Sequence, residues 1–247
     1  MNADGHDDRP EQSTAFARVL DALTPGEHNL TIVFTDIEGF SRMIERVEQA
    51  QGLHAAVLAK EMHDAVLRET LGAGYAYVKS LGDGCLFLYD GLNPPLQPLV
   101  NAQLAFDSFT KLRLRIGVHA GKVYIHPGSP LDKWGMNDPL GHSVNVAHRV
   151  MELAPPGTVY LSRPVYDASQ PNLISNADLT PLGLRALPKL SSRLEIWQLR
   201  PRSFATDRER TDYLHTVLKV SLKAVLMPPI IPIVLAIAKY FRRNRSA

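Results

Sequence analysis

Hydrophobic and polar positions along the chain switch between the period of a strand and the period of a helix. Residues 30–35 form a short apolar and β-branched run, which is typical of a buried strand. Residues 40–71 then carry apolar side chains mostly three to five positions apart, and this spacing predicts one long helix or two helices broken near Gly52. The preceding residues, 1–27, are polar and carry only one short helical pattern, so we expect a loosely ordered lead-in there.

The middle of the chain predicts a hairpin followed by alternating helices and strands. Apolar runs at 75–80 and 85–89 flank the sequence Leu-Gly-Asp-Gly, and Asp-Gly between such runs is a strong hairpin signal. Further along we expect a helix at 97–109, a strand at 111–125, a helix at 141–153, a strand at 158–162, a helical turn at 163–168 and a final strand at 194–199. This order, β-α-β-β-α-β followed by α-β, predicts an α+β fold with a ferredoxin-like core and an αβ extension.

Composition is that of an ordinary globular protein in a reducing compartment. The chain has 247 residues and a hydrophobic fraction of 45%, so a full core can be buried. Its net charge of +2 argues against a protein that binds nucleic acid over its whole surface. Cys85 is the single cysteine, which excludes an internal disulfide and a multi-cysteine metal site. The N-terminus lacks the apolar core of a signal peptide, and we expect a cytoplasmic protein.

Two aspartates are candidates for a cation site. Asp36 follows the first predicted strand and precedes Gly39, while Asp83 lies in the predicted hairpin turn. Each also has an ordinary structural explanation, because aspartate commonly caps helices and forms turns. If the hairpin lies beside the first strand, the two carboxylates converge. Converging carboxylates without paired bases are costly unless a divalent cation lies between them, so the pair predicts such a site.

Four ordered blocks resemble the catalytic domain of the class III nucleotidyl cyclases, the adenylate and guanylate cyclases. They are FTDIEGFS at 34–41, VKSLGDGCLF at 78–87, LRIGVHAGKV at 114–123 and GHSVNVAHRVMELAPPGTVYLS at 141–162. The resemblance covers about residues 28–200 and implies a catalytic domain at 28–201, with a C-terminal tail at 202–247. It also implies a homodimer with two composite active sites and an inactive monomer.

The resemblance implies a role for each matched catalytic position. Asp36 and Asp83 match the aspartates that hold two Mg²⁺ or Mn²⁺ ions, with the carbonyl of Ile37 assisting. Asn145 matches the residue that orients the ribose, and Arg149 the one that stabilises negative charge at the α-phosphate in the transition state. Asn145 and Arg149 are four positions apart, so on a helix they project from one face.

The same resemblance also implies which nucleoside triphosphate is the substrate. Lys79 and Asp138 fall at adenine-reading positions where guanylate cyclases carry Glu and Cys, and Gly39 with Phe40 completes the predicted nucleotide-binding set. We therefore expect an adenylate cyclase that makes a second messenger from ATP. A pyrimidine cyclase that forms cyclic UMP or CMP in antiviral defence is the alternative, because the long loop at 126–138 lies beside the base pocket and pocket shape decides such choices. A catalytically inactive nucleotide-binding signalling module is a third possibility, although mere binding does not require the complete set.

The C-terminal tail carries a separate prediction. Residues 224–238 are an unbroken apolar run that contains three prolines and is flanked by basic residues on both sides. The run is shorter than the ~20 residues that cross a bilayer as a helix, and prolines interrupt helices. We therefore expect peripheral association with the inner face of the cell membrane. Packing of the tail against the dimer or a partner protein is the alternative.

Overall fold

A computed structural model of the chain describes most of the region between the N-terminal lead-in and the tail. The described residues are 23–71, 75–92, 94–110, 112–126, 139–169 and 174–202, together with Phe204, Thr206, Arg208, Glu209 and Asp212. The predictions made for residues 1–22, for Asp138 and for the tail at 224–238 lie outside this set. Within the described residues, no helix is long and apolar enough to cross a membrane.

The order of helices and strands follows the predicted one. The elements are β1 (Gly26–Ile37), α2 (Phe40–Gln51), α3 (Leu53–Leu71), β2 (Tyr75–Ser80), β3 (Cys85–Asp90), α4 (Leu96–Thr110), β4 (Leu114–Ile125), β5 (Pro139–Leu140), α5 (His142–Leu153), β6 (Thr158–Ser162), α6 (Arg163–Ala168), β7 (Ala177–Ala186) and β8 (Arg193–Pro201). Of the two possibilities for residues 40–71, the structure has two helices, because the chain turns at Gly52 with φ 86°.

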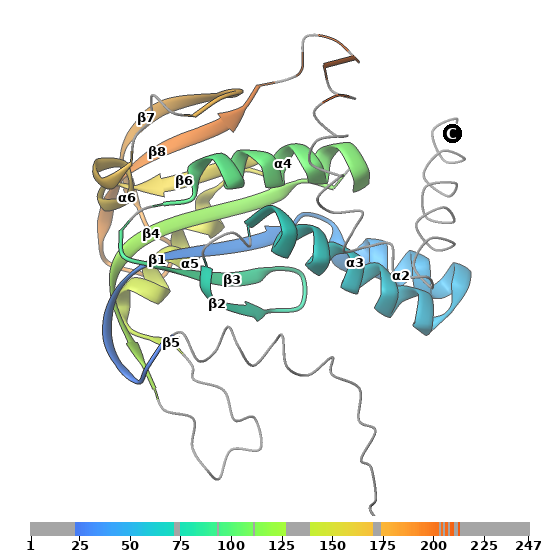
Figure 1. Cartoon of the computed structure of the whole chain (residues 1–247), viewed down its shortest axis with the longest axis horizontal. Helices are drawn as coiled ribbons and strands as arrows, with labels where there is room; N and C mark the ends of the chain where they lie inside the picture. The colour runs from blue at the N-terminus through green and yellow to red at the C-terminus, as the bar shows by residue number, and fades with distance from the viewer. Residues whose placement is uncertain are drawn as a thin grey trace, which may run out of the picture.

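One eight-stranded sheet organises the fold, with the strand order β2-β3-β1-β4-β6-β8-β7 and β5 paired to β4 (Figure 1). The first four strands of this path, β2-β3-β1-β4, have the order of a ferredoxin-like core. Strands β4 and β6 are parallel, whereas β1 is antiparallel to both β3 and β4. The predicted α+β fold with a ferredoxin-like core and an αβ extension is therefore confirmed.

Helices cover both faces of the sheet. Helices α2, α3 and α4 share a buried cluster with one face, to which Val33 of β1 and Phe87 of β3 belong. Helix α5 packs against β4 and β1 on the other face, where Phe34 and Leu86 belong to a second cluster. Because successive strand residues point to opposite faces, these clusters establish which side of the sheet each neighbouring side chain occupies.

Three strands differ from the prediction, and one of them is the two-residue β5, which was not predicted. Strand β1 begins at Gly26 and extends to Ile37, so Asp36 lies inside the strand rather than just after it. Strand β7 was not predicted, because Pro181 and Gly183 break its pattern and most of its side chains are at least partly exposed. Its pairing with β8 shifts register between these two residues, which is how the sheet accommodates the proline.

Candidate active site

The two aspartates predicted to hold metal meet at the end of β1. The Asp36 side chain is 24% exposed, and Asp83 lies exposed in the β2–β3 turn. Burial and then the negative charge of Asp83 raise the pKa of Asp36, and the two carboxyl groups are within hydrogen-bonding reach. Arg115 opposes this rise from β4, with its Nε 3.6 Å from Asp36 Oδ2. The predicted convergence of the two carboxylates is thus confirmed.

Backbone contacts hold the turn against β1. The N–H of Ile37 donates to the carbonyl oxygen of Asp83 across 3.0 Å. A Cβ added at Gly84 would lie 1.8 Å from the carbonyl oxygen of Thr35, so only glycine permits this approach. The Asp-Gly pair therefore does more than form a hairpin turn: its glycine allows the turn to lie directly against the strand that carries Asp36.

The chain leaves β1 through a sharp bend. Gly39 has φ 74°, in the left-handed region, and starts α2. Phe40, predicted to bind substrate, is only 7% exposed, and its ring lies edge-on to His63 with 5.6 Å between ring centroids. The structure therefore corrects the expectation for this side chain, because its apolar ring belongs to the core beneath the bend. Ile37 is also buried, but its predicted role concerns only the backbone carbonyl beside Asp36.

Helix α5 carries the two polar residues expected to act on the ribose and phosphate. Asn145 is exposed and Arg149 is half-buried. Nη1 of Arg149 donates to Oε1 of Glu152 at 2.6 Å, and Nδ1 of His148 lies 3.8 Å from the same oxygen. Burial by itself would raise the pKa of Glu152, but the hydrogen bond from Arg149 outweighs burial and the pKa is lowered. Asn145 and Arg149 thus share a helix, while the guanidinium is engaged by an acid on its own chain.

Lys79 lies on the same side of the sheet as Asp36. In the antiparallel pairing, Lys79 is opposite Leu86, and Leu86 is opposite Phe34. Directly opposite residues share a face, and Asp36 is two positions beyond Phe34, so Lys79 and Asp36 face the α5 side. Lys79 is half-buried there. Its predicted adenine-reading partner, Asp138, lies outside the described residues.

The donor set fits a hard divalent cation. In the described part of the chain, no group of three or more His, Cys, Asp or Glu side chains is arranged to hold a metal, so this site supplies two carboxylates. Mg²⁺ commonly binds through one or two carboxylates, with water and substrate phosphates completing its coordination. Burial and the charge of Asp83 raise the pKa of Asp36 even with Arg115 nearby, and a bound cation would further stabilise both ionised carboxylates.

Sequence reasoning missed two charged neighbours of the site. Arg115 is opposite Asp36 in the β1–β4 register, and only the pairing of those strands reveals this contact. Glu152 follows Arg149 by three positions, a spacing at which side chains on a helix meet, so the sequence does contain that signal.

Comparison with known proteins identifies the family. The adenylate and guanylate cyclase catalytic domain matches residues 24–199. An adenylate cyclase of Streptomyces coelicolor is 31% identical over 156 residues, covering 61% of this chain and 38% of that protein. A pH-sensitive adenylate cyclase of Mycobacterium tuberculosis is 26% identical over 159 residues, covering 64% and 37%. The chain therefore spans less than two fifths of the length of these two relatives.

Solved structures show the same fold. The adenylyl cyclase CyaB of P. aeruginosa aligns with a TM-score of 0.56 at 20% identity, covering 74% of this chain and 100% of that one. The guanylyl cyclase Cya2 aligns with the same TM-score at 16% identity, covering 74% and 98%. Because the family match extends over most of the chain, this protein belongs to the adenylate and guanylate cyclase catalytic domain family, the class III nucleotidyl cyclases.

Proposed function

We propose that this protein is an adenylate cyclase, which converts ATP to 3′,5′-cyclic AMP and pyrophosphate through a catalytic domain at 28–201. The observation that carries the proposal is the convergence of Asp36 and Asp83 at the end of β1. Lys79, which stands at an adenine-reading position where guanylate cyclases carry Glu, supports adenine as the base. The similarity to bacterial adenylate cyclases points to the same substrate.

Asp36 and Asp83 would hold two Mg²⁺ or Mn²⁺ ions, with the Ile37 carbonyl as a further oxygen donor. When bound, these cations lower the pKa of the ribose 3′-hydroxyl and neutralise charge on the triphosphate. In the reaction the 3′-hydroxyl oxygen bonds to the α-phosphorus, the bond from that phosphorus to pyrophosphate breaks, and the hydroxyl proton passes to solvent. Rigid placement of the two carboxylates keeps the attacking and leaving oxygens in position.

Asn145 and Arg149 act from helix α5. Asn145 is exposed, so its amide is free to orient the ribose by hydrogen bonding. The guanidinium of Arg149 forms bidentate hydrogen bonds with phosphate oxygens, in a geometry that the single ammonium of lysine does not reproduce. Glu152 accepts from one guanidinium nitrogen, so phosphate would bind through the remaining N–H donors of Arg149 or displace this contact.

Within one chain, Asp36 and Arg149 have different partners, and a homodimer with composite active sites would explain this separation. The titratable groups that act on Asp36 here are Asp83, Arg115 and His148. Arg149 instead has Glu152 as its described partner. We propose that Asp36 and Asp83 of one protomer meet the nucleotide-binding set of the other across the dimer interface, so that each dimer has two sites. That set is Lys79, Asp138, Asn145 and Arg149.

The decisive experiment is turnover by the purified full-length chain with Mn²⁺ and each of the four ribonucleoside triphosphates, with products separated by mass. Cyclic AMP as the dominant product is expected. Cyclic UMP or cyclic CMP would instead favour the pyrimidine cyclase and an antiviral role. No cyclic product from a demonstrably dimeric preparation would favour a nucleotide-binding signalling module. Asp36→Ala in parallel controls for contaminating cyclases.

We further propose that the tail associates with the inner face of the cell membrane. The proposal rests on the apolar run at 224–238 and its basic flanks. The full-length chain should sediment with vesicles that contain anionic phosphatidylserine and remain in solution with neutral phosphatidylcholine. Replacing Arg242, Arg243 and Arg245 by glutamine should weaken this binding, whereas equal sedimentation with both vesicles would argue against it.

A further inference from the structure

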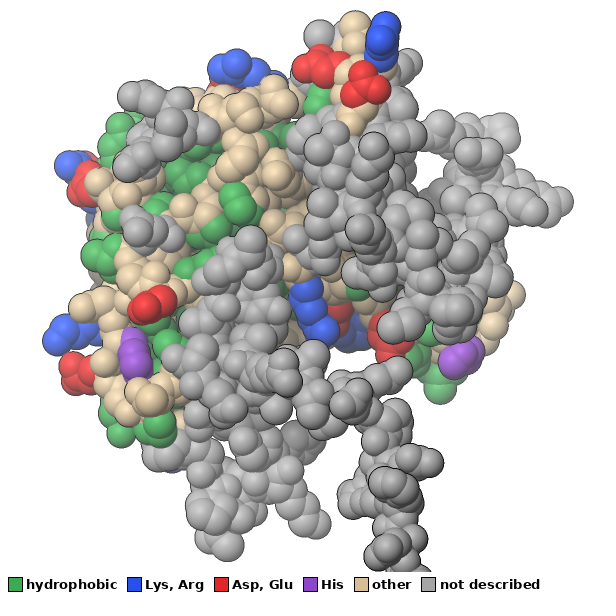
Figure 2. Space-filling view, viewed as in Figure 1, with side chains coloured by type: hydrophobic (Ala, Val, Ile, Leu, Met, Phe, Trp, Pro, Cys, Tyr) green, Lys and Arg blue, Asp and Glu red, His purple; other side chains and the backbone are tan. Residues whose placement is uncertain are grey.

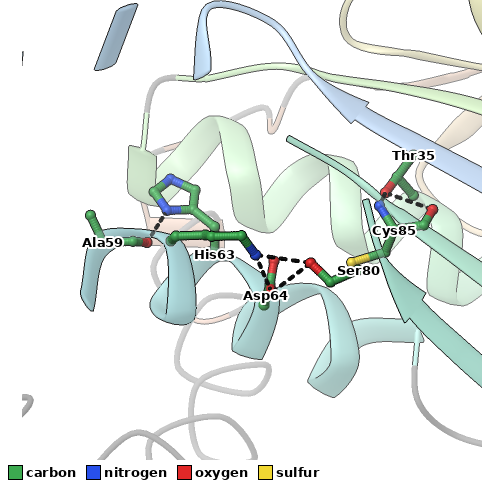
Figure 3. Close-up of polar contacts among 7 residues, drawn as sticks. Thr35, Ala59, His63, Asp64, Ser80 and Cys85 are labelled. Carbon is green, nitrogen blue, oxygen red and sulfur yellow. Dashed lines mark hydrogen bonds and ion pairs between the residues drawn. The ribbon is translucent and has the colours of Figure 1, made fainter. Parts of the chain in front are cut away.

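The turn that carries Asp83 is held at both ends by side chains from other elements. Ser80 precedes the turn, and Cys85 follows it. Ser80 is bonded to Asp64 and Lys60 of α3, and Cys85 is bonded to Thr35 of β1 (Figure 3). We call Thr35, Lys60, Asp64 and Ser80 the turn clamp.

The contacts before the turn form a closed triangle. Lys60 Nζ donates to Asp64 Oδ2 at 2.7 Å and to Ser80 Oγ at 2.9 Å. The Ser80 hydroxyl in turn donates to Asp64 Oδ2 at 3.1 Å. Asp64 is only 9% exposed, so its charge depends on these partners. The triangle therefore joins the end of β2 to α3 through charge-assisted hydrogen bonds, which are stronger than neutral ones.

The contacts after the turn continue the sheet beyond its backbone pairing. The β1–β3 register ends at Phe34 and Leu86. At the next position, the Thr35 hydroxyl accepts from the Cys85 N–H at 2.9 Å and donates to the Cys85 carbonyl at 3.3 Å. Thr35 is 2% exposed, so these two bonds are shielded from water. A side chain thus takes the place of a strand backbone at the point where the turn ends and β3 begins.

The turn clamp lies on the opposite side of the sheet from the substrate positions. Ser80 and Cys85 are opposite each other in the β2–β3 pairing, next to Lys79 and Leu86 on the α5 side. Alternation along the strands places Ser80 and Thr35 toward α3, away from Lys79 and Asp36. The clamp residues are therefore separated from substrate by the sheet, and any effect on the reaction must pass through the turn.

The turn needs support because its carboxylate faces another carboxylate. Like charges at close range repel, and Asp83 is exposed, so an unrestrained turn would move away from Asp36. The face shown in Figure 2 carries its acidic and basic side chains in small separate groups. Specific contacts from α3 and β1 hold the turn in place.

We propose that the turn clamp positions Asp83 against Asp36 for divalent cation binding. This inference rests on the proposed function, in which both aspartates are metal ligands. Thr35, Lys60, Asp64 and Ser80 are positioning residues rather than catalytic ones. Residues that orient a ligand from behind typically change metal affinity by about 10- to 100-fold when they are removed.

The test measures Mn²⁺ binding by the full-length chain directly, through electron paramagnetic resonance of the free ion, alongside turnover at increasing Mn²⁺. Ser80→Ala and Thr35→Val each remove one hydroxyl and keep a compatible shape. We expect about a 10-fold weaker Mn²⁺ affinity for each, with most of the turnover restored at saturating Mn²⁺ and an unchanged KM for ATP. Ser80→Thr retains the hydroxyl, so it should bind Mn²⁺ about as tightly as the unsubstituted protein does.

Thr70→Val is the matched control. Thr70 is a half-buried hydroxyl on the same helix, but it donates to the Val66 carbonyl of its own helix at 2.7 Å. Its removal should leave Mn²⁺ affinity unchanged. Thermal unfolding is measured for every variant, so that affinities are compared at temperatures where each protein is fully folded.

Asp83→Asn separates failure of the clamp from failure of the site. If Asp83→Asn leaves Mn²⁺ affinity unchanged, the two-aspartate metal site itself is wrong. If Asp83→Asn weakens binding while Ser80→Ala and Thr35→Val behave like Thr70→Val, the metal site stands and the positioning role is wrong. The proposal is supported if Asp83→Asn, Ser80→Ala and Thr35→Val all bind Mn²⁺ more weakly while Thr70→Val binds it normally.

Discussion

The backbone N–H of Ile37 donates a hydrogen bond to the carbonyl oxygen of Asp83 across 3.0 Å. Ile37 directly follows Asp36, so this bond ties one aspartate to the neighbour of the other. The bond helps to keep the two carboxylates close, together with the Arg115 guanidinium beside Asp36. The unfavourable electrostatics of the pair is offset by backbone and side-chain contacts around it, and this leads to predictions about both stability and activity.

Asp83→Asn should abolish metal-dependent turnover and yet stabilise the metal-free protein. Burial and the charge of Asp83 raise the pKa of Asp36 in the folded protein above its ordinary value of 3.8. The folded protein therefore loses stability through Asp36 as pH rises from 3.8 through the raised pKa. Removing the charge of Asp83 relieves part of this cost at neutral pH. We expect turnover to fall at least ~10²-fold. In EDTA, thermal melting should rise by about 2–4 °C, the shift for ~1 kcal/mol in a protein of this size.

The control for that prediction is Asp167→Asn. Asp167 is exposed and pairs with Arg163 at 2.7 Å, away from the site, so both turnover and melting should change little. A melting temperature of Asp83→Asn in EDTA below that of the unsubstituted protein would show that the carboxylates do not repel each other as inferred.

Arg149→Ala should slow turnover by ~10²- to 10³-fold, because a preorganised positive charge at the developing phosphate charge is lost. Arg149→Lys should recover no more than about tenfold of that loss, since lysine lacks the bidentate geometry. Arg163→Ala removes an exposed arginine with two carboxylate partners, and it should retain full activity. Sedimentation velocity should show the same dimer for all three variants, and full activity of Arg149→Ala would exclude its catalytic role.

A mixing experiment tests the composite site. Asp36→Ala and Arg149→Ala are each expected to be inactive, for different reasons. In a mixed dimer, one of the two sites combines the intact aspartates of one protomer with the intact Arg149 of the other. Random exchange between equal amounts should therefore restore about a quarter of wild-type turnover, since half the dimers are mixed and half of their sites are intact. No recovery after demonstrated subunit exchange would mean that each site is built within one chain.

Gly84→Ala should destabilise the protein strongly. The added Cβ would lie 1.8 Å from the carbonyl oxygen of Thr35, a contact that neither backbone can relieve without moving the turn. We expect a loss of at least ~3 kcal/mol in urea unfolding. Gly183→Ala is the matched comparison, because Gly183 has φ 73° but no atom within 4 Å of its added Cβ. Its cost should stay near ~1 kcal/mol, and similar losses for both variants would contradict the close packing at Gly84.

Acid should destabilise the fold through His119. Burial, followed by the charge of His142, lowers the pKa of His119 from 6.5 to about 4, and its Nδ1 lies 2.8 Å from Ser162 Oγ. The unfolded chain takes up a proton on this histidine below pH ~6.5, whereas the folded chain does so only near pH 4. The stability that depends on neutral His119 is therefore complete above ~6.5 and declines as pH falls toward 4, by about 3 kcal/mol.

Urea unfolding at pH 7 and at pH 5 measures this dependence. In His119→Gln the difference in unfolding free energy between the two pH values should shrink, because the replaced side chain does not titrate. His126→Gln is the control, since His126 is exposed beyond the end of β4. An unchanged difference in His119→Gln would assign the acid sensitivity to other groups.

Local signals in the sequence were sufficient for most helices and strands. The break at Gly52 and the hairpin around Asp83 depend on residues close together in the chain, so spacing and turn chemistry predict them. Strand β7 could not be predicted, because Pro181 and Gly183 remove the alternating pattern and only pairing with β8 makes that segment a strand.

The sequence by itself determined the order of most elements and the family resemblance, and it named the candidate active-site residues, since each of these is written in short, contiguous blocks. Only the tertiary structure decided what surrounds them. The Arg115 contact with Asp36 follows from the β1–β4 register, and the Asp64 contact with Ser80 follows from how α3 packs on the sheet. Distances between such residues depend on strand register and helix packing, which the whole core determines and no local pattern encodes.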